Sequence, residues 1–597
     1  MSAADTGATP AAGSRSPHPG IPVPPVAGRD PEYGSDLVVD LLVDLGVEIV
    51  ALAPGATFRG LHDSLVNHRP DAPEIIHCLH EEISVAVAHG YAKASGTMPV
   101  AALHDVVGLQ HATMALYNAW CDRVPLLAIG GTGPVDAARR RPWIDWIHTA
   151  NVQATQVRDY TKWDDQPASL EAVPESLVRA RQLATSVPCG PVYVCLDSEV
   201  QEQAVTEATP RLRAEAYPTA RPLHPAPDAV EEVAHALAAA RMPLVAVESV
   251  QRDQATLEAL AELSLLLGAP VVEVQRDYNR TELCVPTRHP HNLTGIPLPE
   301  APDVVLALEV RDVAVIPGAG DAPVYQVSTA GLGVKAWAAD LQRVQPARLL
   351  LAAEVGPTVR ALLDALRGRV ADDDVLRSRV GARAARIADL TARQRRAWEE
   401  EAGAVPDDGG VTPAHLAHVL GRVVAPHEPV LANGSLHNWV HRLWSIDRVD
   451  RYLGSSGGAG LGYGLGASVG AALAHRGTGR LVVDVQSDGD ALMTPSAFWT
   501  AAHHAAPLLV VMENNRQWGN SVMHAGRIAA ARGRSLENAG VGTVIRHPDV
   551  DFVALAGAMG IGHAVRVERA DQLEAALQEA AAVVLTRRRP AVVEVLT

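Results

Sequence analysis

The sequence of 597 residues has no hydrophobic run long enough to cross a membrane. Its longest apolar stretches, such as PLLVVM (507–512), have the length of a β-strand, whereas a membrane-spanning helix needs about 20 apolar residues. Hydrophobic residues still make up 48% of the chain and charged residues 20%, which is typical of a soluble globular protein. A chain of this length is expected to form about three or four domains.

Cysteine and basic residues are both scarce. The five cysteines are scattered in apolar contexts, so we expect neither a disulfide framework nor a zinc site, and a reducing cytoplasm fits best. The 51 basic residues against 68 acidic ones give a formal net charge of -17, which disfavours nucleic acid or an anionic membrane surface as a partner. Small anionic ligands stay compatible, because a helix N-terminus or a metal ion supplies positive potential locally.

The order of the patterns predicts an α/β fold. Helical periodicity alternates with short apolar strands along most of the chain, which is typical of parallel sheets covered by helices on both faces. The first 30 residues are rich in Pro, Ala, Gly and Ser and lack the features of a signal peptide. We predict a disordered tail (1–30), a first domain (31–205), a linker (206–227), a central domain (228–366), a connecting helix or linker (367–410) and a third domain (411–597).

The ends of two predicted strands argue most strongly for a function. The strand LVVDVQ is followed by Ser487, Asp488 and Gly489, and the strand PLLVVMEN ends at Asn514 and Asn515. The separation, 515 - 488 = 27 residues, suits one strand-helix-strand crossover, so both ends should reach the same sheet edge. Carboxylate, amide and carbonyl oxygens suit Mg²⁺, which often completes its coordination with phosphate. The alternative is that DG and NN only mark turns.

This segment resembles the thiamine diphosphate motif, in which GDG is followed, after a spacer of this length, by NN. Asp488, Asn515 and the carbonyl of Gln517 fall on its Mg²⁺-ligand positions, and Ser487 replaces the first glycine. The resemblance covers nearly everything after residue 34 and implies three doubly wound parallel-sheet domains, which are the pyrimidine-binding, central and diphosphate-binding domains. It implies cofactor contacts from Leu461, Gly460, Ser435, Gly489, Asp490, Ala491, Asn515 and Trp518.

The same resemblance identifies a catalytic acid. In CLHEEISVAVAHGYAKASG (78–96), Glu81 falls on the family's catalytic glutamate and Glu82 is its neighbour. A carboxylic acid that protonates the aminopyrimidine ring needs an apolar setting, where a raised pKa keeps its proton available. The residues alone leave a simpler alternative, an acidic residue that favours a helix N-terminus. Leu461 falls on the position of the apolar wedge that bends the cofactor into a V.

Within the family, two segments resemble benzoylformate decarboxylase: AGLGYGLGAS in the third domain and ALHDVVGLQHATMALYNAW in the first. The spacing from Glu81 to His104, 104 - 81 = 23 residues, agrees with that enzyme's catalytic pair. His104 is therefore expected to exchange a proton with the intermediate. The alternative is that His104 is a histidine with a structural role only. Ala56 stands where that enzyme has a serine, which argues against specificity for benzoylformate.

The resemblance implies a thiamine diphosphate- and Mg²⁺-dependent lyase or transferase that acts on a 2-oxo acid. It would decarboxylate or ligate its substrate through a C2-ylide and an enamine. Each site would form between the first domain of one subunit and the third domain of another, so the minimum active unit would be a homodimer and commonly a homotetramer. Residues 520–545 are expected to include a lid over the site.

Three alternatives stay open. An acetolactate synthase-like carboligase would add a structural FAD on the central domain, where no dinucleotide fingerprint stands out. A 2-hydroxyacyl-CoA lyase ranks lower, because its relatives extend beyond the last strand to cover the acyl-CoA. A non-catalytic thiamine-fold subunit would not need Glu81, Leu461, Asp488 and Asn515 together.

Overall fold

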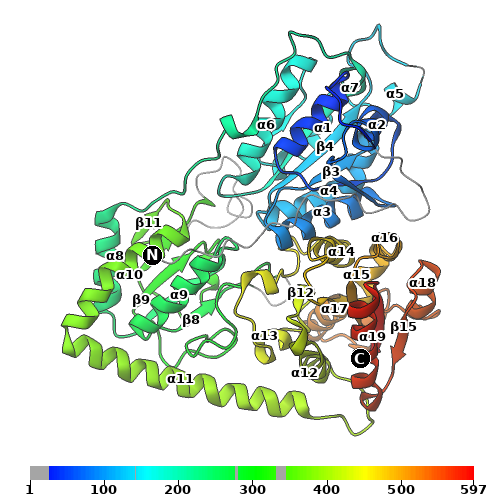
Figure 1. The fold of residues 1–597 in the computed structure, drawn as a ribbon. Helices are drawn as coiled ribbons and strands as arrows, with labels where there is room; N and C mark the ends of the chain where they lie inside the picture. The colour runs from blue at the N-terminus through cyan, green and yellow to red at the C-terminus, as the bar shows by residue number, and fades with distance from the viewer. Residues whose placement is uncertain (1–25, 142, 276–279, 331–344) are drawn as a thin grey trace.

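The chain folds into three α/β domains, each built on one parallel sheet (Figure 1). The structure is a computed structural model that describes residues 26–141, 143–275, 280–330 and 345–597. The predicted tail therefore lies almost wholly outside the described residues. All strand pairings within the three sheets are parallel, which confirms the predicted fold class. In the described part of the chain, no helix is both long and apolar enough to cross a membrane.

The first domain has a six-stranded sheet with the order β2-β1-β3-β4-β6-β5. Its strands are β1 (Ile49–Leu52), β2 (Glu74–His77), β3 (Val100–Leu103), β4 (Leu126–Thr132), β5 (Asp164–Asp165) and β6 (Pro191–Asp197). Its helices are α1 (Gly34–Asp44), α2 (Arg59–Asn67), α3 (Glu81–Ser95), α4 (Asp105–Cys121), α5 (Ile144–Ile147), α6 (Val173–Thr185) and α7 (Ser198–Glu202).

The central domain has a five-stranded sheet with the order β11-β10-β9-β7-β8. Its elements are α8 (Pro227–Ala239), β7 (Pro243–Val247), α9 (Gln254–Leu267), β8 (Val271–Glu273), β9 (Val304–Leu308), β10 (Val324–Val327), β11 (Leu349–Leu351) and α10 (Val355–Asp372). Helix α10 continues beyond the predicted domain end at residue 366, because Val370 still packs against apolar residues of the next helix. That helix, α11 (Asp374–Gly403), runs along the molecule to the third domain (Figure 1).

The third domain repeats the architecture with the strand order β12-β13-β14-β16-β15. Its strands are β12 (Val430–Asn433), β13 (Val482–Ser487), β14 (Leu508–Asn514), β15 (Ala564–Val567) and β16 (Ala591–Leu596). Its helices are α12 (Pro413–Val424), α13 (Trp439–Leu443), α14 (Gly464–Ala474), α15 (Asp488–Met493), α16 (Ala497–His503), α17 (Gly519–Ala531), α18 (Phe552–Ala558) and α19 (Ala570–Arg587).

Strand β14 shows why this sheet has a continuous apolar sequence. Leu509 and Val511 pack into one core cluster, whereas Leu508, Val510 and Met512 pack into another. Alternate side chains of a strand point to opposite faces, so both faces of the sheet are covered, as is typical of parallel sheets. Each fully buried side chain of this size contributes about 1.5–3 kcal/mol.

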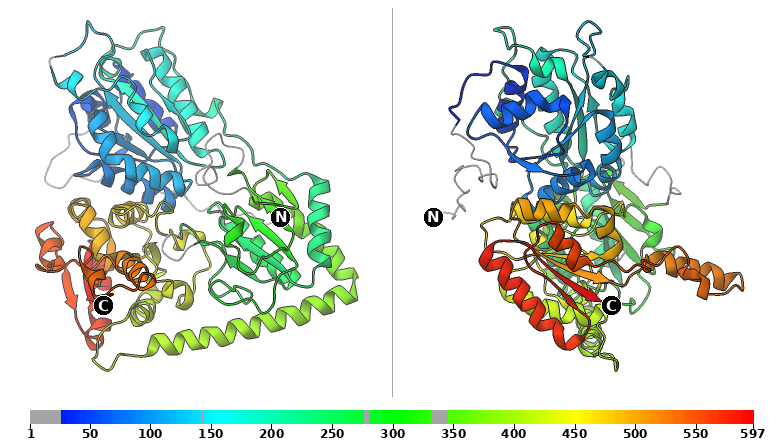
Figure 2. Two further views of the ribbon diagram at one scale, coloured as in Figure 1. Left: turned by 180° about the vertical axis from the view of Figure 1, so that it is seen from behind. Right: turned by 90° about the vertical axis from the view of Figure 1, so that its right-hand side faces the viewer.

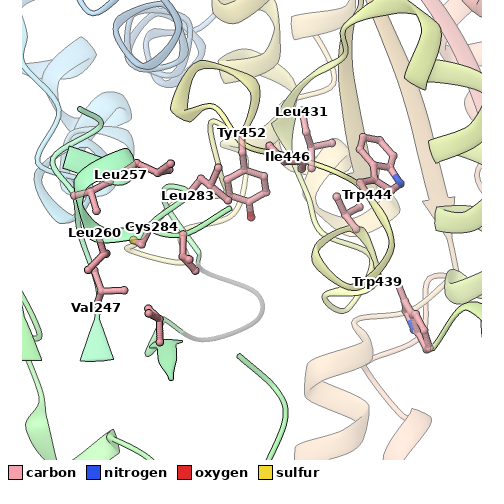
Figure 3. Close-up of a cluster of buried hydrophobic side chains, with 14 of the residues drawn as sticks. Val247, Leu257, Leu260, Leu283, Cys284, Leu431, Trp439, Trp444, Ile446 and Tyr452 are labelled. Carbon is pink, nitrogen blue, oxygen red and sulfur yellow. The ribbon is translucent and has the colours of Figure 1, made fainter. Parts of the chain in front are cut away.

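The domains pack directly against one another. Helix α3 of the first domain crosses α14 of the third at close range, because a Cβ on Gly90 would lie 1.9 Å from the carbonyl oxygen of Ala467, and one on Gly470 would lie 1.9 Å from that of Val87. The central and third domains share a buried apolar cluster (Figure 3). In contrast, α17 projects away from the body of the chain (Figure 2) and has no buried residue. The lid expected at residues 520–545 stays a prediction.

Candidate active site

Two strand ends meet at one edge of the third sheet. Strands β13 and β14 are adjacent, and Ser487 lies opposite Glu513. The residues that follow the two strands are therefore level with one another. Trp518, which follows β14, lies directly on Gly489, which follows β13, since a Cβ placed on Gly489 would be 2.5 Å from the indole. The two halves of the sequence motif form one surface.

Asp488 carries a buried carboxylate at this edge that is only partly compensated by backbone N–H groups. Its residue is 1% exposed, and its Oδ1 accepts a hydrogen bond from the N–H of Gly489 at 2.9 Å. Its Oδ2 has no hydrogen-bond partner among the described residues, and burial raises the pKa of the carboxyl to about 6. A buried carboxylate is costly unless a cation or donor faces it. Asp488 therefore fits the role of a metal ligand.

The two asparagines have different tasks. Asn514 is buried and donates a hydrogen bond from Nδ2 to Oε1 of Glu594 at 2.7 Å, which ties β14 to β16. Asn515 is more exposed, and its Oδ1 accepts the N–H of Gln517 at 3.1 Å. This side-chain turn directs the chain past the sheet edge. The backbone N–H of Gln517 also faces Asp488 and lowers the pKa of that carboxyl, against the larger effect of burial. Asn515 and Gln517 thus lie beside Asp488.

The loop after β12 reaches the same edge, because β12 pairs with β13. Gly434 has φ +81°, and a Cβ there would lie 2.2 Å from a carbonyl oxygen of β13. Leu436, His437 and Asn438 follow with φ of 48°, 53° and 67°, a run of left-handed conformations that non-glycine residues rarely adopt. Such conformations are concentrated at functional sites. Ser435 lies at the start of this run.

The glycine-rich loop 454–462 lies over the start of α15. Asp490 holds it, because Oδ1 accepts the N–H of Gly462 at 2.7 Å and Oδ2 accepts that of Gly464 at 3.1 Å. The neighbouring Leu461 is 43% exposed, so its side chain is presented outward. Ala491 is buried in the core. Asp490 and Ala491 were both expected to contact a cofactor. Because the side chain of Asp490 binds the loop and that of Ala491 packs in the core, only their backbone atoms are left for such a contact.

The first turn of α3 supplies two acids that face different neighbours. The helix begins with an imidazole cap, since the N–H of Glu82 donates to Nδ1 of His80. Oε2 of Glu81 lies 3.1 Å from Nδ1 of His111. Glu82 instead faces the third domain: a Cβ on Gly462 would lie 2.8 Å from its Oε1. Burial, followed by the charge of Asp490, raises the pKa of Glu82 to about 7.

His104 lies at the end of β3 and caps α4. Gly55 allows its close approach, because a Cβ there would lie 2.2 Å from the imidazole ring. Its Nδ1 lies 3.1 Å from the hydroxyl of Thr57, and its ring meets that of His148 edge-on, with 5.4 Å between the ring centroids. Burial, followed by the proximity of His148, lowers the pKa of His104, so the imidazole is neutral near pH 7.

Sequence reasoning missed two features of this region. Glu82 was treated only as a neighbour of Glu81, although it is the acid that reaches the glycine-rich loop of this chain. The contacts of Asn118 on α4 with Gly460 were not predicted at all. No local pattern marks a single buried asparagine in a helix, so only the packing of two distant segments reveals it.

Comparison with known proteins defines the class. The family model described as "Thiamine pyrophosphate enzyme, N-terminal TPP binding domain" matches residues 33–157, and "Thiamine pyrophosphate enzyme, C-terminal TPP binding domain" matches residues 432–595. Thiamine pyrophosphate is another name for thiamine diphosphate. The chain carries both binding domains and belongs to the thiamine pyrophosphate enzymes.

Its relatives define the branch. The chain is 28% identical to benzoylformate decarboxylase of Pseudomonas aeruginosa over 87% of its own length and 91% of the relative's. It is 26% identical to a probable chloroplastic acetolactate synthase of Oryza sativa subsp. japonica over 93% and 82% of the two chains. A 4-hydroxybenzoylformate decarboxylase from Rhodococcus jostii shares the fold, with a TM-score of 0.75 at 20% identity over 95% and 99% of the two chains. The protein is thus a member of the decarboxylase and acetolactate synthase branch.

Proposed function

We propose that the protein uses thiamine diphosphate and Mg²⁺ to cleave or ligate a 2-oxo acid. The observation that carries the proposal is the buried Asp488, whose Oδ2 has no hydrogen-bond partner among the described residues. It lies where the ends of β13 and β14 meet, below the loop that presents Leu461. A buried carboxylate with one oxygen left without a hydrogen-bond partner among the described residues would be stabilised by a divalent cation.

The two ends of the cofactor would be held by different segments. Asp488, Asn515 and the carbonyl of Gln517 would bind Mg²⁺, which would neutralise the charge of the diphosphate. Ser435, Gly489 and Trp518, with the backbone of Asp490 and Ala491, would surround the diphosphate. Gly460 and Leu461 would support the bend between the two rings. When bound, thiamine diphosphate supplies a carbanion that adds to the substrate carbonyl and accepts the electrons left by the departing CO₂.

The first domain provides the proton-transfer groups. Glu81 is the proposed acid, held by His111 at 3.1 Å. His104 has Nδ1 beside the hydroxyl of Thr57, so Nε2 would be the nitrogen that exchanges a proton with the reacting group. A neutral imidazole is suited to accept that proton. Glu82 is the other acid in the same helical turn, and it lies beside Gly462. The role of Glu81 must therefore be tested against that of Glu82.

We further propose a cytoplasmic homo-oligomer, with a dimer as the minimum unit and commonly a tetramer. The projecting segment of α17 and the following turn support this assembly, because it exposes large apolar side chains. These exposed side chains are Met523, Ile528, Leu536, Val541 and Val544. Exposed apolar surface of this kind is typical of a contact with another chain.

The function is tested by supplying the purified protein with thiamine diphosphate, Mg²⁺ and a panel of 2-oxo acids. Release of CO₂ with an aldehyde product identifies a decarboxylase, whereas a 2-hydroxy-2-alkyl-3-oxo acid or another ligated product identifies a carboligase. A bound yellow chromophore would favour the acetolactate synthase-like alternative with FAD. Absence of any cofactor-dependent product across the panel would contradict the proposal.

The catalytic acid is tested by a matched pair of variants. Glu81→Gln is expected to abolish turnover while leaving cofactor binding largely intact, because the amide keeps the shape but cannot supply a proton. Glu82→Gln serves as the control at the adjacent position. Normal turnover in Glu81→Gln, with loss in Glu82→Gln, would transfer the proton-relay role to Glu82.

A further inference from the structure

The backbone on both sides of Leu461 is held by side chains from two different domains. On one side, Gly462 donates its N–H to Oδ1 of Asp490 in the third domain at 2.7 Å. On the other side, Gly460 bonds to Asn118 of α4 in the first domain. An exposed leucine at the centre of a glycine-rich loop has little packing of its own, so its position depends on these backbone contacts.

Asn118 both donates a hydrogen bond to Gly460 and accepts one from it. Its Nδ2 donates to the carbonyl oxygen of Gly460 at 3.1 Å, and its Oδ1 accepts the N–H of the same residue at 3.2 Å. The asparagine is 1% exposed, so water does not compete. A Cβ on Gly458 would lie 2.6 Å from Oδ1 of Asn118, which shows that the loop lies directly on the amide.

Asp122, the C-cap residue of α4, adds a second contact one helical turn beyond Asn118. Its Oδ1 accepts the N–H of Gly457, and its Oδ2 lies 2.5 Å from Nζ of Lys93 and 2.9 Å from Nε2 of His89. All three side chains are fully buried. Lys93 also donates to the carbonyl oxygen of Ser455 at 3.1 Å. Residues four apart on a helix share a face, so Asn118 and Asp122 form one continuous clamp on the loop.

The charges of this network are expensive to bury. Replacing a buried ion pair by apolar residues is often neutral or stabilising, so stability alone does not explain why Asp122, Lys93 and His89 are buried together. Their polar contacts instead hold the glycine-rich loop in place. Each contact described above is made either with the backbone of loop 454–462 or with a side chain that contacts this backbone. Arg252 of the central domain completes the arrangement by donating to the carbonyl oxygen of Leu453 at 3.3 Å.

We propose that Asn118 and Asp122 are positioning residues, which fix the glycine-rich loop so that Leu461 is presented in the conformation that supports the bound cofactor. The role of Leu461 in this inference rests on the proposed function. The clamp itself consists of hydrogen bonds within this chain and does not depend on a bound cofactor. The two residues act through the loop and do not contact the substrate. The first domain therefore contributes to the geometry of the cofactor site as well as to proton transfer.

The test compares Asn118→Ala and Asn118→Asp with an exposed control, Asn67→Asp, at the end of α2. In the protein without cofactor, hydrogen exchange of peptides that cover residues 454–462 is expected to accelerate in both Asn118 variants and to be unchanged in the control. In the presence of Mg²⁺, calorimetry is expected to show thiamine diphosphate affinity reduced by about tenfold to a hundredfold, the effect of losing two hydrogen bonds. Asn118→Asp, which has the same shape, keeps the test valid if the alanine variant does not fold.

Unchanged exchange in the loop would overturn the clamp, whether or not the protein binds thiamine diphosphate. Faster exchange with unchanged affinity would overturn the link to the cofactor. Failure of the unaltered protein to bind thiamine diphosphate would instead contradict the proposed function, so the two failures are distinguishable.

Discussion

The indole of Trp518 lies on the backbone of Gly489, and this contact joins the two strand ends that form the cofactor edge. Gly489→Ala would place a methyl group 2.5 Å from the ring, so Trp518 must move. Such overpacking costs about 1–3 kcal/mol. We expect the Mg²⁺-dependent affinity for thiamine diphosphate to fall in calorimetric titrations.

The control for this change is Gly381→Ala on the exposed side of α11, where an added Cβ meets nothing within 4 Å. It is expected to leave the affinity unchanged and not to lower the melting temperature, because alanine favours a helix more than glycine does. Equal affinity in Gly489→Ala and Gly381→Ala would show that the contact with Trp518 does not shape the site.

Asp488→Asn is expected to separate stability from binding. Because burial raises the pKa of Asp488 to about 6, the ionised carboxylate is unfavourable at pH 8 without a cation, and the neutral amide is expected to raise the melting temperature of the cofactor-free protein. Cofactor affinity in Mg²⁺ is expected to fall by about a hundredfold or more, since even indirect partners of metal ligands contribute 10–100-fold. Thermal unfolding with and without ligands measures both effects. Asp571→Asn, at an exposed position, is the control.

The sequence predicted the features that repeat along the chain or lie close together within it. Alternating strands and helices predicted the three parallel sheets, and the 27-residue spacing predicted that the ends of β13 and β14 share one sheet edge. Both depend on local hydrophobic patterns and on the length of one crossover. The different contacts of Asn514 and Asn515 do not follow from local patterns, because Asn514 bonds to Glu594, which lies 80 residues further along the chain.

The features that sequence reasoning missed depend on contacts between domains. Asn118 meets Gly460 across 342 residues, and Glu82 meets Gly462 only because α3 crosses α14. The glycines that permit this crossing, Gly90 and Gly470, have no distinctive local pattern. Side-chain orientation also escaped prediction for Asp490, because its backbone partners lie in a loop that is separate in sequence.

Glu82 should make stability depend on pH. Burial raises its folded-state pKa from 4.5 to about 7, so the folded state binds the proton more tightly than the unfolded state. The resulting stabilisation is present below pH 4.5 and is lost as pH rises through about 7. Glu82→Gln cannot ionise, so its melting temperature relative to the unaltered protein is expected to be higher at pH 8 than at pH 5. A constant difference across this range would contradict the raised pKa of the half-buried Glu82.

The last prediction concerns which chains build one site. The proposal places Glu81 of one subunit opposite Asp488 of another, and single substitutions at either position are expected to be inactive. If these residues act across an interface, a mixed dimer of Glu81→Gln and Asp488→Asn contains one site with both native residues. Co-expression of the two variants with different affinity tags, followed by sequential purification, would isolate such mixed dimers.

The mixed dimers are expected to recover about half the turnover per dimer, because one of two sites is intact. Each variant purified alone is the matched control. A double variant, Glu81→Gln with Asp488→Asn, co-expressed with the unaltered chain gives the opposite arrangement, in which each cross-interface site has one substitution and activity is lost. The reverse pattern, with inactive mixed dimers and active double-variant hybrids, would place Glu81 and Asp488 of the same chain in one site, as the direct packing of α3 on α14 within the chain would allow.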